Sequence, residues 1–287
     1  MNFLYHDDTV NQNITFILMK KTLFLLLLTF LAYTSHAQRG EIGAFSGISY
    51  YQGDLSAGLG LHEPRFGFGF FAGYAPIDHL TIKGSFYRGQ ISGHDKHQKN
   101  VLLRERNLSF RSTLSELGLR LEYNILGFRP DGMYTPFSPY VFVGAAATHH
   151  NPKTEYQGEW HELQPLGTEG QGIPGYEQRY NRVIFALPFG AGVKYALSEN
   201  LAVGFEMGLR MTFTDYLDDV STNYVDPEIL QGASSRGNLA AALSNRTGEF
   251  LEEPVIFENG AQRGGADVND YYFMGGITVF ININGGY

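Results

Sequence analysis

The stretch LAVGFEMGLRMTF, residues 201–213, decides the fold of this chain. Large apolar side chains occupy every second position in it, namely Leu201, Val203, Phe205, Met207, Leu209, Met211 and Phe213. The residues between them are small or polar and include Glu206 and Arg210. A period of two is typical of a strand with one apolar and one polar face. In a soluble sandwich the apolar face packs on a second sheet, whereas in a membrane barrel it contacts lipid and the charged face lines the interior.

The same alternation recurs along the chain and predicts eight strands. They cover residues 41–51, 65–75, 80–92, 113–126, 139–149, 182–196, 201–215 and 270–283. Most are longer than the roughly 5–6 residues usual in soluble sheets. Their length matches the roughly 9–11 residues that a tilted membrane strand needs. The strand lengths therefore favour the membrane barrel.

The connections between these strands alternate in length. The shorter ones are residues 76–79, 127–138 and 197–200, and the longer ones are 52–64, 93–112, 150–181 and 216–269. This alternation is typical of an outer-membrane barrel, whose long loops usually lie outside the cell. We therefore predict an all-β fold, an eight-stranded antiparallel up-and-down transmembrane β-barrel with short turns on one rim and long loops on the other.

The long loops are polar and rich in glycine and proline. We expect Pro152, Pro165, Pro174 and Pro227 to discourage regular structure in them. The exception is NLAAALSN, residues 238–245, which is predicted to form one short helix.

The N-terminal region carries the pattern of an export signal. Lys20 and Lys21 precede the apolar run TLFLLLLTFLAY, residues 22–33, and small residues follow up to Ala37. We interpret residues 19–37 as a secretory signal peptide and residues 38–287 as the barrel domain. The run is shorter than the roughly 20 residues of a transmembrane helix, which disfavours a single-pass anchor. Residues 1–18 lack this pattern, and we interpret them as an extension from a wrongly assigned start.

Composition excludes several classes of function. The chain has 287 residues and no cysteine, which excludes disulfides, zinc–thiolate sites, thiol catalysis and a lipoprotein anchor. A net charge of -8 disfavours nucleic acid as a partner. The 35 Gly, 18 Tyr and 22 Phe residues suit curved strands with aromatic girdles. Nothing in the sequence indicates a cofactor, a resident metal or a small-molecule substrate.

The barrel interior is predicted to hold a network of charges. An eight-stranded barrel is just wide enough inside for side chains to fill it. The alternation points charges of both signs inward: Glu41, Lys83, Glu116, Arg120, Glu122, Lys194, Glu206 and Arg210. Because an unpaired buried charge is costly, we expect them to pair and fill the interior. That argues against a porin or a ligand channel.

Five stretches together resemble a known family. They are EIGAFSGISYYQGDL (41–55), RNLSFRSTLSEL (106–117), LQPLGTEGQG (163–172), LPFGAGVKY (187–195) and LRMTFTDYLDD (209–219). In this order they are similar to the PorG-like family of outer-membrane barrels, components of the type IX secretion system. The resemblance covers nearly the whole mature chain.

The resemblance implies a non-enzymatic subunit in the cell outer membrane. It would contact outer-membrane lipid and associate with a periplasmic ring built from a lipoprotein and its partner, in the machine that exports proteins with a C-terminal sorting domain. The family-like rim motif comprises Arg106, Asp215, Tyr216, Asp218 and Asp219. These residues are expected near the long-loop rim, whereas the ring would meet the short-turn rim. The motifs are therefore structural, or they meet a second partner, or the orientation is inverted.

Four residue groups are candidate ligand sites. Asp215, Asp218 and Asp219 are close enough in sequence to bind Ca²⁺, but their spacing matches no EF-hand loop, and we favour a solvated strand end. His94 with His97, and His149 with His150, lack a third ligand at a readable spacing, which favours ordinary polar loop residues. The Gly-rich GTEGQG, residues 167–172, lacks the lysine of a phosphate-binding loop.

Two other functions remain open from the sequence. One is a stand-alone small barrel that acts in envelope stability or adhesion. The other is a hydrolase at the long-loop rim, formed by Ser109, His149, His150 and Asp215. A catalytic triad is recognised by its geometry, and the chain has no G-x-S-x-G motif, so we favour a protein that is not an enzyme.

Overall fold

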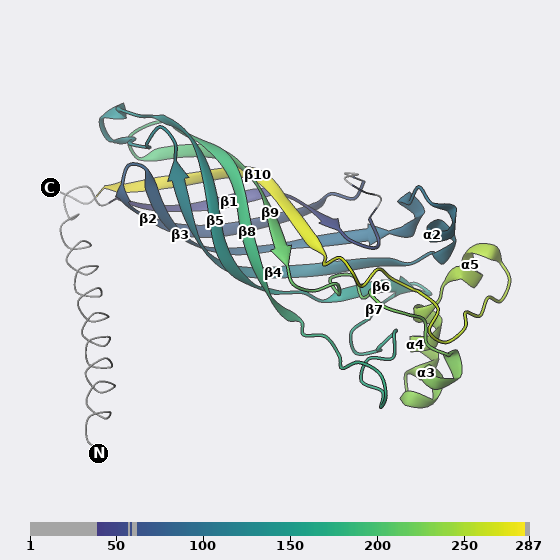
Figure 1. The fold of residues 1–287 in the computed structure, drawn as a ribbon. Coiled ribbons are helices and arrows are strands. Elements are labelled where there is room, and N and C mark those ends of the chain that lie inside the picture. Colours follow the sequence, from purple (N-terminus) through teal and green to yellow (C-terminus); the bar gives the residue numbers. More distant parts are fainter. Residues whose placement is uncertain (1–38, 57, 59–61, 285–287) are drawn as a thin grey trace, which may run out of the picture.

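The computed structural model describes residues 39–56, 58 and 62–284; the predicted N-terminal extension and signal peptide lie outside the described residues. Within this part, ten strands form one sheet and all except β6 and β7 form a barrel (Figure 1). The barrel strands are β1 (Arg39–Gln52), β2 (Arg65–Ile77), β3 (Leu80–His94), β4 (Ser109–Asn124), β5 (Phe137–His149), β8 (Val183–Ala196), β9 (Leu201–Thr212) and β10 (Tyr271–Asn284).

The barrel is closed and follows an up-and-down topology. Each barrel strand pairs antiparallel with the barrel strands that precede and follow it in the chain. The last strand returns to the first, in a register that runs from Arg39 opposite Asn284 to Gln52 opposite Tyr271. The predicted eight-stranded antiparallel barrel is therefore confirmed.

The short and long connections lie on opposite rims, as predicted. The short rim carries residues 78–79, 125–136 and 197–200, with the 3-10 turn η2 (Asp131–Met133) in the second of these. At the other rim the long connections fold together. We call residues 53–56, 62–64, 95–108, 150–182 and 213–270 the loop head (Figure 1).

The loop head holds more regular structure than expected. Its elements are η1 (Asp95–His97), α2 (Val101–Arg106), β6 (Pro152–Tyr156), β7 (Glu159–Glu162), α3 (Pro227–Ala233), α4 (Gly237–Ser244) and α5 (Thr247–Leu251). The helix predicted at 238–245 matches α4, but the expectation from the prolines is wrong at two positions. Pro152 begins β6, and Pro227 lies in the first turn of α3, where a missing N–H breaks no helical hydrogen bond.

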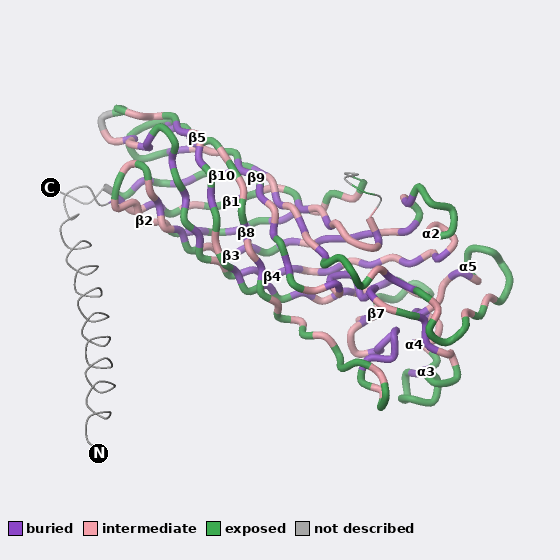
Figure 2. Tube along the Cα trace, in the orientation of Figure 1, coloured by how far each residue is buried: buried purple, intermediate pink, exposed green. Residues whose placement is uncertain are grey.

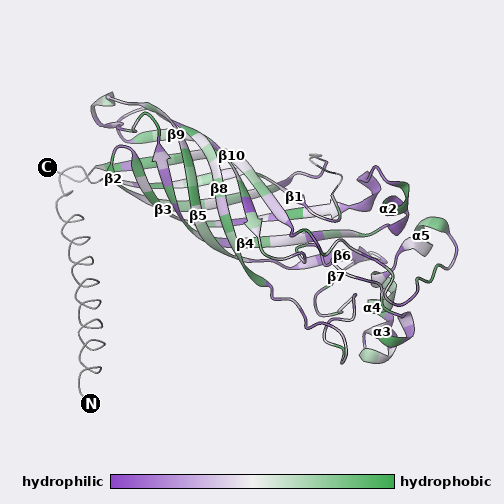
Figure 3. Cartoon of the chain, in the orientation of Figure 1, coloured by the Kyte–Doolittle hydropathy of each residue, from purple (hydrophilic) through white to green (hydrophobic). Residues whose placement is uncertain are grey.

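The outer face of the barrel is apolar and exposed. Alternate residues along each strand are exposed and buried (Figure 2), and hydrophobic residues cover the barrel more densely than the loop head (Figure 3). Phe66, Leu117 and Leu119 are 65%, 68% and 61% exposed. With charges inside and apolar side chains outside, the barrel has the polarity of a protein solvated by lipid. None of the helices among the described residues has the length and apolar character needed to cross a bilayer.

We call the apolar, exposed outer face of the barrel the lipid-facing band, and substitutions test whether it contacts lipid. Leu119 lies near the middle of β4 and faces outward, while Leu102, 71% exposed, lies on α2 in the loop head. Leu119→Arg should lower the free energy of unfolding in phospholipid vesicles by about 2–4 kcal/mol. The matched Leu102→Arg should change it by less than about 0.5 kcal/mol, because that side chain faces water. Urea titration of the refolded barrel measures both, and equal effects would contradict a lipid-facing band.

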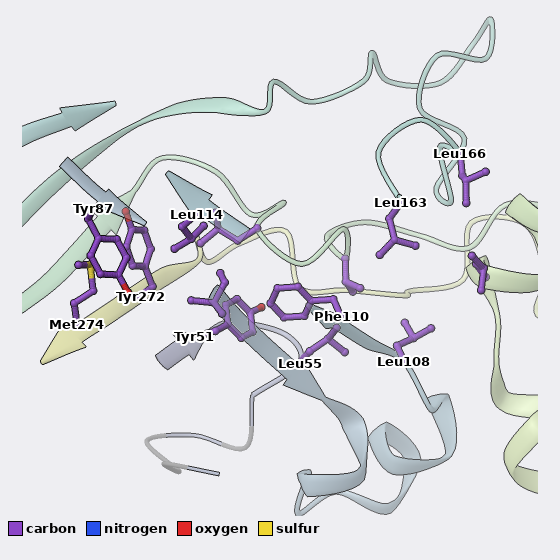
Figure 4. Close-up of a cluster of buried hydrophobic side chains, with 14 of the residues drawn as sticks. Tyr51, Leu55, Tyr87, Leu108, Phe110, Leu114, Leu163, Leu166, Tyr272 and Met274 are labelled. Atoms are coloured by element: carbon purple, nitrogen blue, oxygen red, sulfur yellow. The ribbon is translucent and has the colours of Figure 1, made fainter. Parts of the chain in front are cut away.

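A single apolar core joins the barrel to the loop head. Figure 4 shows Tyr87, Tyr272 and Met274 inside the barrel, and the same cluster continues through Tyr51 and Leu114. It extends into the loop head through side chains that are nearly or fully buried, Leu55, Leu108, Leu163 and Leu217. Tyr51 packs edge-on against Phe110, with ring centroids 4.7 Å apart. The loop head is therefore built on the open end of the barrel by continuous packing.

Candidate functional site

Glu122 is the centre of the charge network inside the barrel. Its carboxylate oxygens lie 2.8 Å from Lys83 Nζ and 2.6 Å from Lys194 Nζ. Arg120 donates to the same carboxylate over 2.9 Å. Lys83 also lies 2.6 Å from Glu41 Oε1, so one layer of the interior holds two acids and three cations.

Two further acids complete the network towards the loop head. Arg120 binds Glu206 through both guanidinium nitrogens, at 2.9 and 2.7 Å, and Tyr140 donates to the same carboxylate at 2.9 Å. In the next layer Glu116 accepts from Tyr272 at 2.6 Å and lies 3.4 Å from Arg210 Nε.

The structure thus brings together all eight interior charges named from the sequence. Each is 6% exposed or less, and each lies in at least one ion pair with another. Aromatic rings separate the layers, with Lys83 over the ring of Phe71 and Arg120 over that of Phe142. The interior of the barrel is therefore filled by side chains whose charges pair with one another.

A second buried polar cluster lies in the loop head, around Arg106. Arg106 forms a two-pronged ion pair with Asp95, with both N–O distances at 2.8 Å. It also donates to the carbonyl oxygens of Arg263, at 2.6 Å, and Asp54, at 3.1 Å. Burial disfavours its charge, but hydrogen bonding and attraction to Asp95 outweigh this and raise the pKa of Arg106. One guanidinium therefore ties together three segments of the loop head.

Arg263 forms the matching centre on the other side of this cluster. It binds Glu169 Oε1 at 2.7 Å and the carbonyl oxygens of Asp219, at 2.8 Å, and Ser244, at 2.9 Å. Glu169 in turn accepts from the backbone N–H groups of Ser221 and Thr222, both at 3.0 Å. The loop that carries Glu169 is thereby fixed to the segment that follows β9.

Asp218 and Asp270 form a carboxylate pair under this cluster. Tyr51 OH contacts both of them, at 2.5 Å from Asp218 Oδ2 and 3.0 Å from Asp270 Oδ1. Burial raises the pKa of both carboxyl groups, and the proximity of other carboxylates raises each further. Both carboxyl groups therefore favour the protonated form more than an exposed carboxyl does.

The rim motif named from the sequence is buried rather than solvated. Asp215, Asp218 and Asp219 are 8%, 1% and 0% exposed, so the expectation of a solvated strand end is wrong. The reason is that the loops fold over the end of β9, which the local sequence could not indicate. Tyr216 stacks on Tyr180 with ring centroids 4.8 Å apart. Across the described residues, no group of three or more acidic or histidine side chains is arranged to hold a metal ion.

The Gly-rich motif is a turn that presents Glu169. Gly167, Gly170 and Gly172 have φ values of 67°, 82° and 88°, in the left-handed region that favours glycine. A Cβ on Gly167 would lie 2.5 Å from the carbonyl oxygen of Gln171. Between these glycines Thr168 donates to Asp219 Oδ2 at 2.5 Å. The motif therefore has a structural use that does not involve phosphate.

Neither of the two candidate histidine pairs has a third metal ligand in the part of the chain that the structure describes. His97 contacts Glu63 at 3.1 Å and packs edge-on against His94, while His149 is on the exposed outer face. His150 is buried and bonds the Asn181 carbonyl oxygen at 3.1 Å, and burial lowers its pKa to about 4.

The hydrolase constellation is not assembled. Ser109 Oγ lies 3.3 Å from Thr154 Oγ1, and the ring of His150 bonds a backbone carbonyl rather than Asp215. A nucleophile, base and orienting acid must be within hydrogen-bond reach of one another. These three residues therefore do not form a triad in this structure.

Four residues that complete the cluster in the loop head were not singled out from the sequence. Asp54 and Glu169 lie inside two of the family-like stretches, so the resemblance of those stretches could have drawn attention to them. Asp95 and Arg263 lie in loops with no periodicity, and nothing local marks them. Only the folded loops bring Arg263 to within 2.7 Å of Glu169.

The carboxyl groups of the loop head predict a dependence of stability on pH. Burial raises the pKa of Asp215 and of Asp219 from 3.8 to about 7. Between these values the folded state holds protons that the unfolded chain has lost. Stability of the loop head should therefore fall as pH rises from 4 towards 7, by at most about 1.4 kcal/mol per pH unit for each group.

Hydrogen exchange of residues 213–270 between pH 5 and 8, corrected for intrinsic rates, measures this dependence. Asp215→Asn should reduce the slope, because the amide replaces one of the two carboxyl groups whose pKa burial raises to about 7. Asp267→Asn, at an exposed position of the same loop, is the control and should leave the slope unchanged. Protection that increases with pH would contradict the prediction.

Several solved barrel structures are similar to this chain at low sequence identity. Ail, the attachment invasion locus protein of Yersinia pestis, is 10% identical, with 86% of this chain and 99% of that chain covered and a TM-score of 0.43. The N-terminal β-barrel domain of Pseudomonas aeruginosa OprF is 13% identical, with coverages of 85% and 97% and a TM-score of 0.34. OprG from the same organism is 12% identical, with coverages of 88% and 97% and a TM-score of 0.36. No protein of curated function matches the sequence.

A family model matches most of the chain. Its description is Domain of unknown function (DUF6089), and it matches residues 20–233. That range includes the first seven barrel strands, the β6–β7 hairpin and the segments that carry Arg106, Glu169 and Asp219. The protein therefore belongs to the DUF6089 family.

Proposed function

We propose that this protein is a non-enzymatic outer-membrane subunit of the type IX protein secretion machine, which associates with the periplasmic ring lipoprotein and its partner. The observation that carries the proposal is a filled barrel that supports an ordered loop head. Glu122 and its partners occupy the interior with paired charges, which leaves a scaffolding role rather than transport. The reason for proposing the type IX secretion machine in particular is that five stretches, in the same order along the chain, resemble the PorG-like family.

Three of the family-like stretches supply buried residues of the loop head, which supports a structural role for the rim motif. Arg106, Glu169 and Asp219 come from three of these stretches and belong to one buried cluster. Arg106 and Asp219 are 6% and 0% exposed, so neither is available to a partner. The motifs near the long-loop rim are thus compatible with a periplasmic ring that meets the opposite rim.

Location in the outer membrane follows from the same proposal. The apolar band around the barrel requires a bilayer, and the barrel provides the spanning strands. The predicted signal peptide would export the chain, and the long loops would then face the cell exterior by the usual orientation of such barrels.

Deletion of the gene and recovery of the protein in mild detergent test the proposal. Sorting-domain cargo should accumulate in the periplasm of the deletion strain, and the tagged protein should recover the ring lipoprotein and its partner. Unchanged secretion of the cargo would overturn the proposed role.

Two matched variants locate the contact with the ring. Tyr134, 76% exposed, lies on the short-turn rim, and Phe250, 51% exposed, lies on α5 in the loop head. Tyr134→Ser should reduce recovery of the ring, whereas Phe250→Ser should not. The reverse result would place the ring at the loop head and invert the assumed orientation.

A stand-alone barrel in envelope stability or adhesion is the second candidate. The observation that favours it is the apolar surface of the loop head, where α2 and α5 are in contact and Leu102 and Phe250 are exposed. Exposed apolar residues in water often mark a binding surface. If this candidate is right, the detergent pull-down should recover no ring component, and the deletion strain should secrete the cargo normally.

A further inference from the structure

A cleft of about 490 Å³ lies beside the loop head. The end of β3 and η1 form one wall, and the β6–β7 hairpin forms the other. The start of β4 lies between them, because Ser92 of β3 pairs with Arg111, and Arg111 pairs with Lys153 of β6. The volume is in the range of small-ligand sites. The lining includes Arg65, Lys96, Ser109, Arg111, Trp160 and Arg246.

The lining of the cleft has more positive than negative charge. Four cationic and two acidic side chains line it, in a chain whose net charge is -8; one of the cations, Arg246, is already paired with Glu249 at 2.7 Å, outside the lining. Glu63 is shared, at 3.6 Å from Arg65 and 3.8 Å from Lys96. A positive cleft on an acidic protein selects for anions.

Arg111 is the least satisfied of these cations. Its guanidinium lies over the ring of Trp160, 4.3 Å from the centroid. Its buried Nε has no hydrogen-bond partner, and no carboxylate lies within ion-pair distance of it, in the part of the chain that the structure describes. An unpaired guanidinium fixed against an aromatic ring is prepared to bind an oxyanion through its remaining N–H groups.

On the outer face of β4, the cleft lies just beyond the apolar side chains of the lipid-facing band. Leu117 contacts lipid, and towards the loop head the outward residues become Ser115, Thr113 and Arg111. At about 3.3 Å per residue and a strand tilt of about 40°, Arg111 lies about 15 Å above Leu117. Arg88, exposed on β3, donates to Ser115 at 3.2 Å and adds a cation between these levels. This level lies outside the hydrocarbon core, on the side of the lipid headgroups and of sugars attached to them.

We propose that this cleft binds a phosphorylated or carboxylated saccharide, the sugar portion of an anionic glycolipid in the surrounding leaflet. Arg111 and Lys96 supply the cations for the acidic groups. Ser109, Asn107 and Gln157 supply hydrogen-bonding groups for hydroxyls. Trp160, 44% exposed, offers an apolar ring edge and face for sugar C–H groups. The mainly polar lining does not suit an acyl chain, which stays in the bilayer.

The inference rests on the outer-membrane location proposed above, but not on secretion. Its test uses only the purified mature protein in phosphatidylcholine nanodiscs, so failure of binding leaves the secretion role untouched. Trp160 is the single tryptophan of the chain, and its fluorescence therefore reports on the cleft alone. The probes are a bisphosphorylated glucosamine disaccharide glycolipid, soluble glucosamine 6-phosphate, phosphatidylglycerol and a hexaglutamate peptide.

The glycolipid should change the fluorescence of Trp160 with saturation, and the affinity should fall as salt increases. Arg111→Gln should weaken binding by about tenfold or more. Lys96→Gln should weaken it in the same direction, and because Lys96 is 57% exposed this change spares folding. Arg179→Gln removes an exposed charge of the loop head outside the cleft and should leave the affinity unchanged. Binding of glucosamine 6-phosphate as well would assign the site to free as well as lipid-linked sugars.

Three results would overturn the proposal. One is a Trp160 signal that does not respond to the glycolipid. Another is equal binding of phosphatidylglycerol, insensitive to Arg111→Gln and Lys96→Gln, which would indicate only general attraction to anionic lipid. The third is tighter binding of hexaglutamate through the same residues, which would assign the cleft to an acidic peptide.

Discussion

Glu122→Gln is expected to lower the free energy of unfolding of the barrel by about 3–5 kcal/mol. Glu122 is fully buried and lies within 2.9 Å of Lys83, Lys194 and Arg120. The amide has nearly the same shape as the carboxylate, so the substitution removes charge without creating a cavity. Three buried cations then share the two remaining acids, Glu41 and Glu206.

Glu159→Gln is the matched control for this effect. Glu159 is on the exposed β6–β7 hairpin, and the same chemical change there should cost less than about 0.5 kcal/mol. Urea titration of the protein refolded in vesicles measures both variants. Adding Lys194→Met to Glu122→Gln should recover part of the loss, because the added change removes one unpaired cation. A cost for Glu122→Gln as small as for Glu159→Gln would show that water enters the barrel and screens these charges.

Arg106→Met is expected to destabilise the loop head by about 3–5 kcal/mol while the barrel remains folded. The substitution leaves Asp95 buried without its cation and removes the donors to the carbonyl oxygens of Arg263 and Asp54. The loop head should therefore open more often than in the unmodified protein. Its exchange with solvent and its cleavage by protease should become faster by about two orders of magnitude or more.

Hydrogen exchange of residues 95–108 and 213–270, compared with β1 and β10, separates the two parts of the molecule. Arg104→Met changes the same residue type on the same helix, where Arg104 donates only to the carbonyl oxygens of Gln98 and Lys99. It should leave protection of 213–270 unchanged. If Arg106→Met also left that region protected, the buried cluster would not be what holds the loop head together.

The barrel could be predicted from the sequence because its signal is local and repeated. Apolar side chains alternate with small or polar ones throughout residues 201–213. This stretch forms β9, which pairs with β8 and β10. The eight interior charges could be named for the same reason, since alternation fixes which face each residue occupies. Their partners could not be named, because register between strands sets which charge meets which.

The loop head was largely hidden from sequence reasoning. The β6–β7 hairpin, α2 and α5 are short, and their stability comes from packing on neighbouring loops rather than from periodicity. Asp219 shows the consequence. In the sequence it follows a predicted strand and lies next to other acids, yet in the structure Thr168 and Tyr180 donate to it and it is fully buried.

The sequence by itself determined that this chain forms a barrel with an apolar exterior and a charged interior, because side-chain direction in a strand depends only on position along it. The tertiary structure alone decided that the long loops enclose Arg106 and Arg263 with their acidic partners. It alone also placed Arg111 against Trp160 in a positive cleft. Those contacts join segments up to 157 residues apart, as in the bond from Arg106 to the Arg263 carbonyl oxygen. Their energies arise from burial and charge pairing that exist only when the loops are folded together.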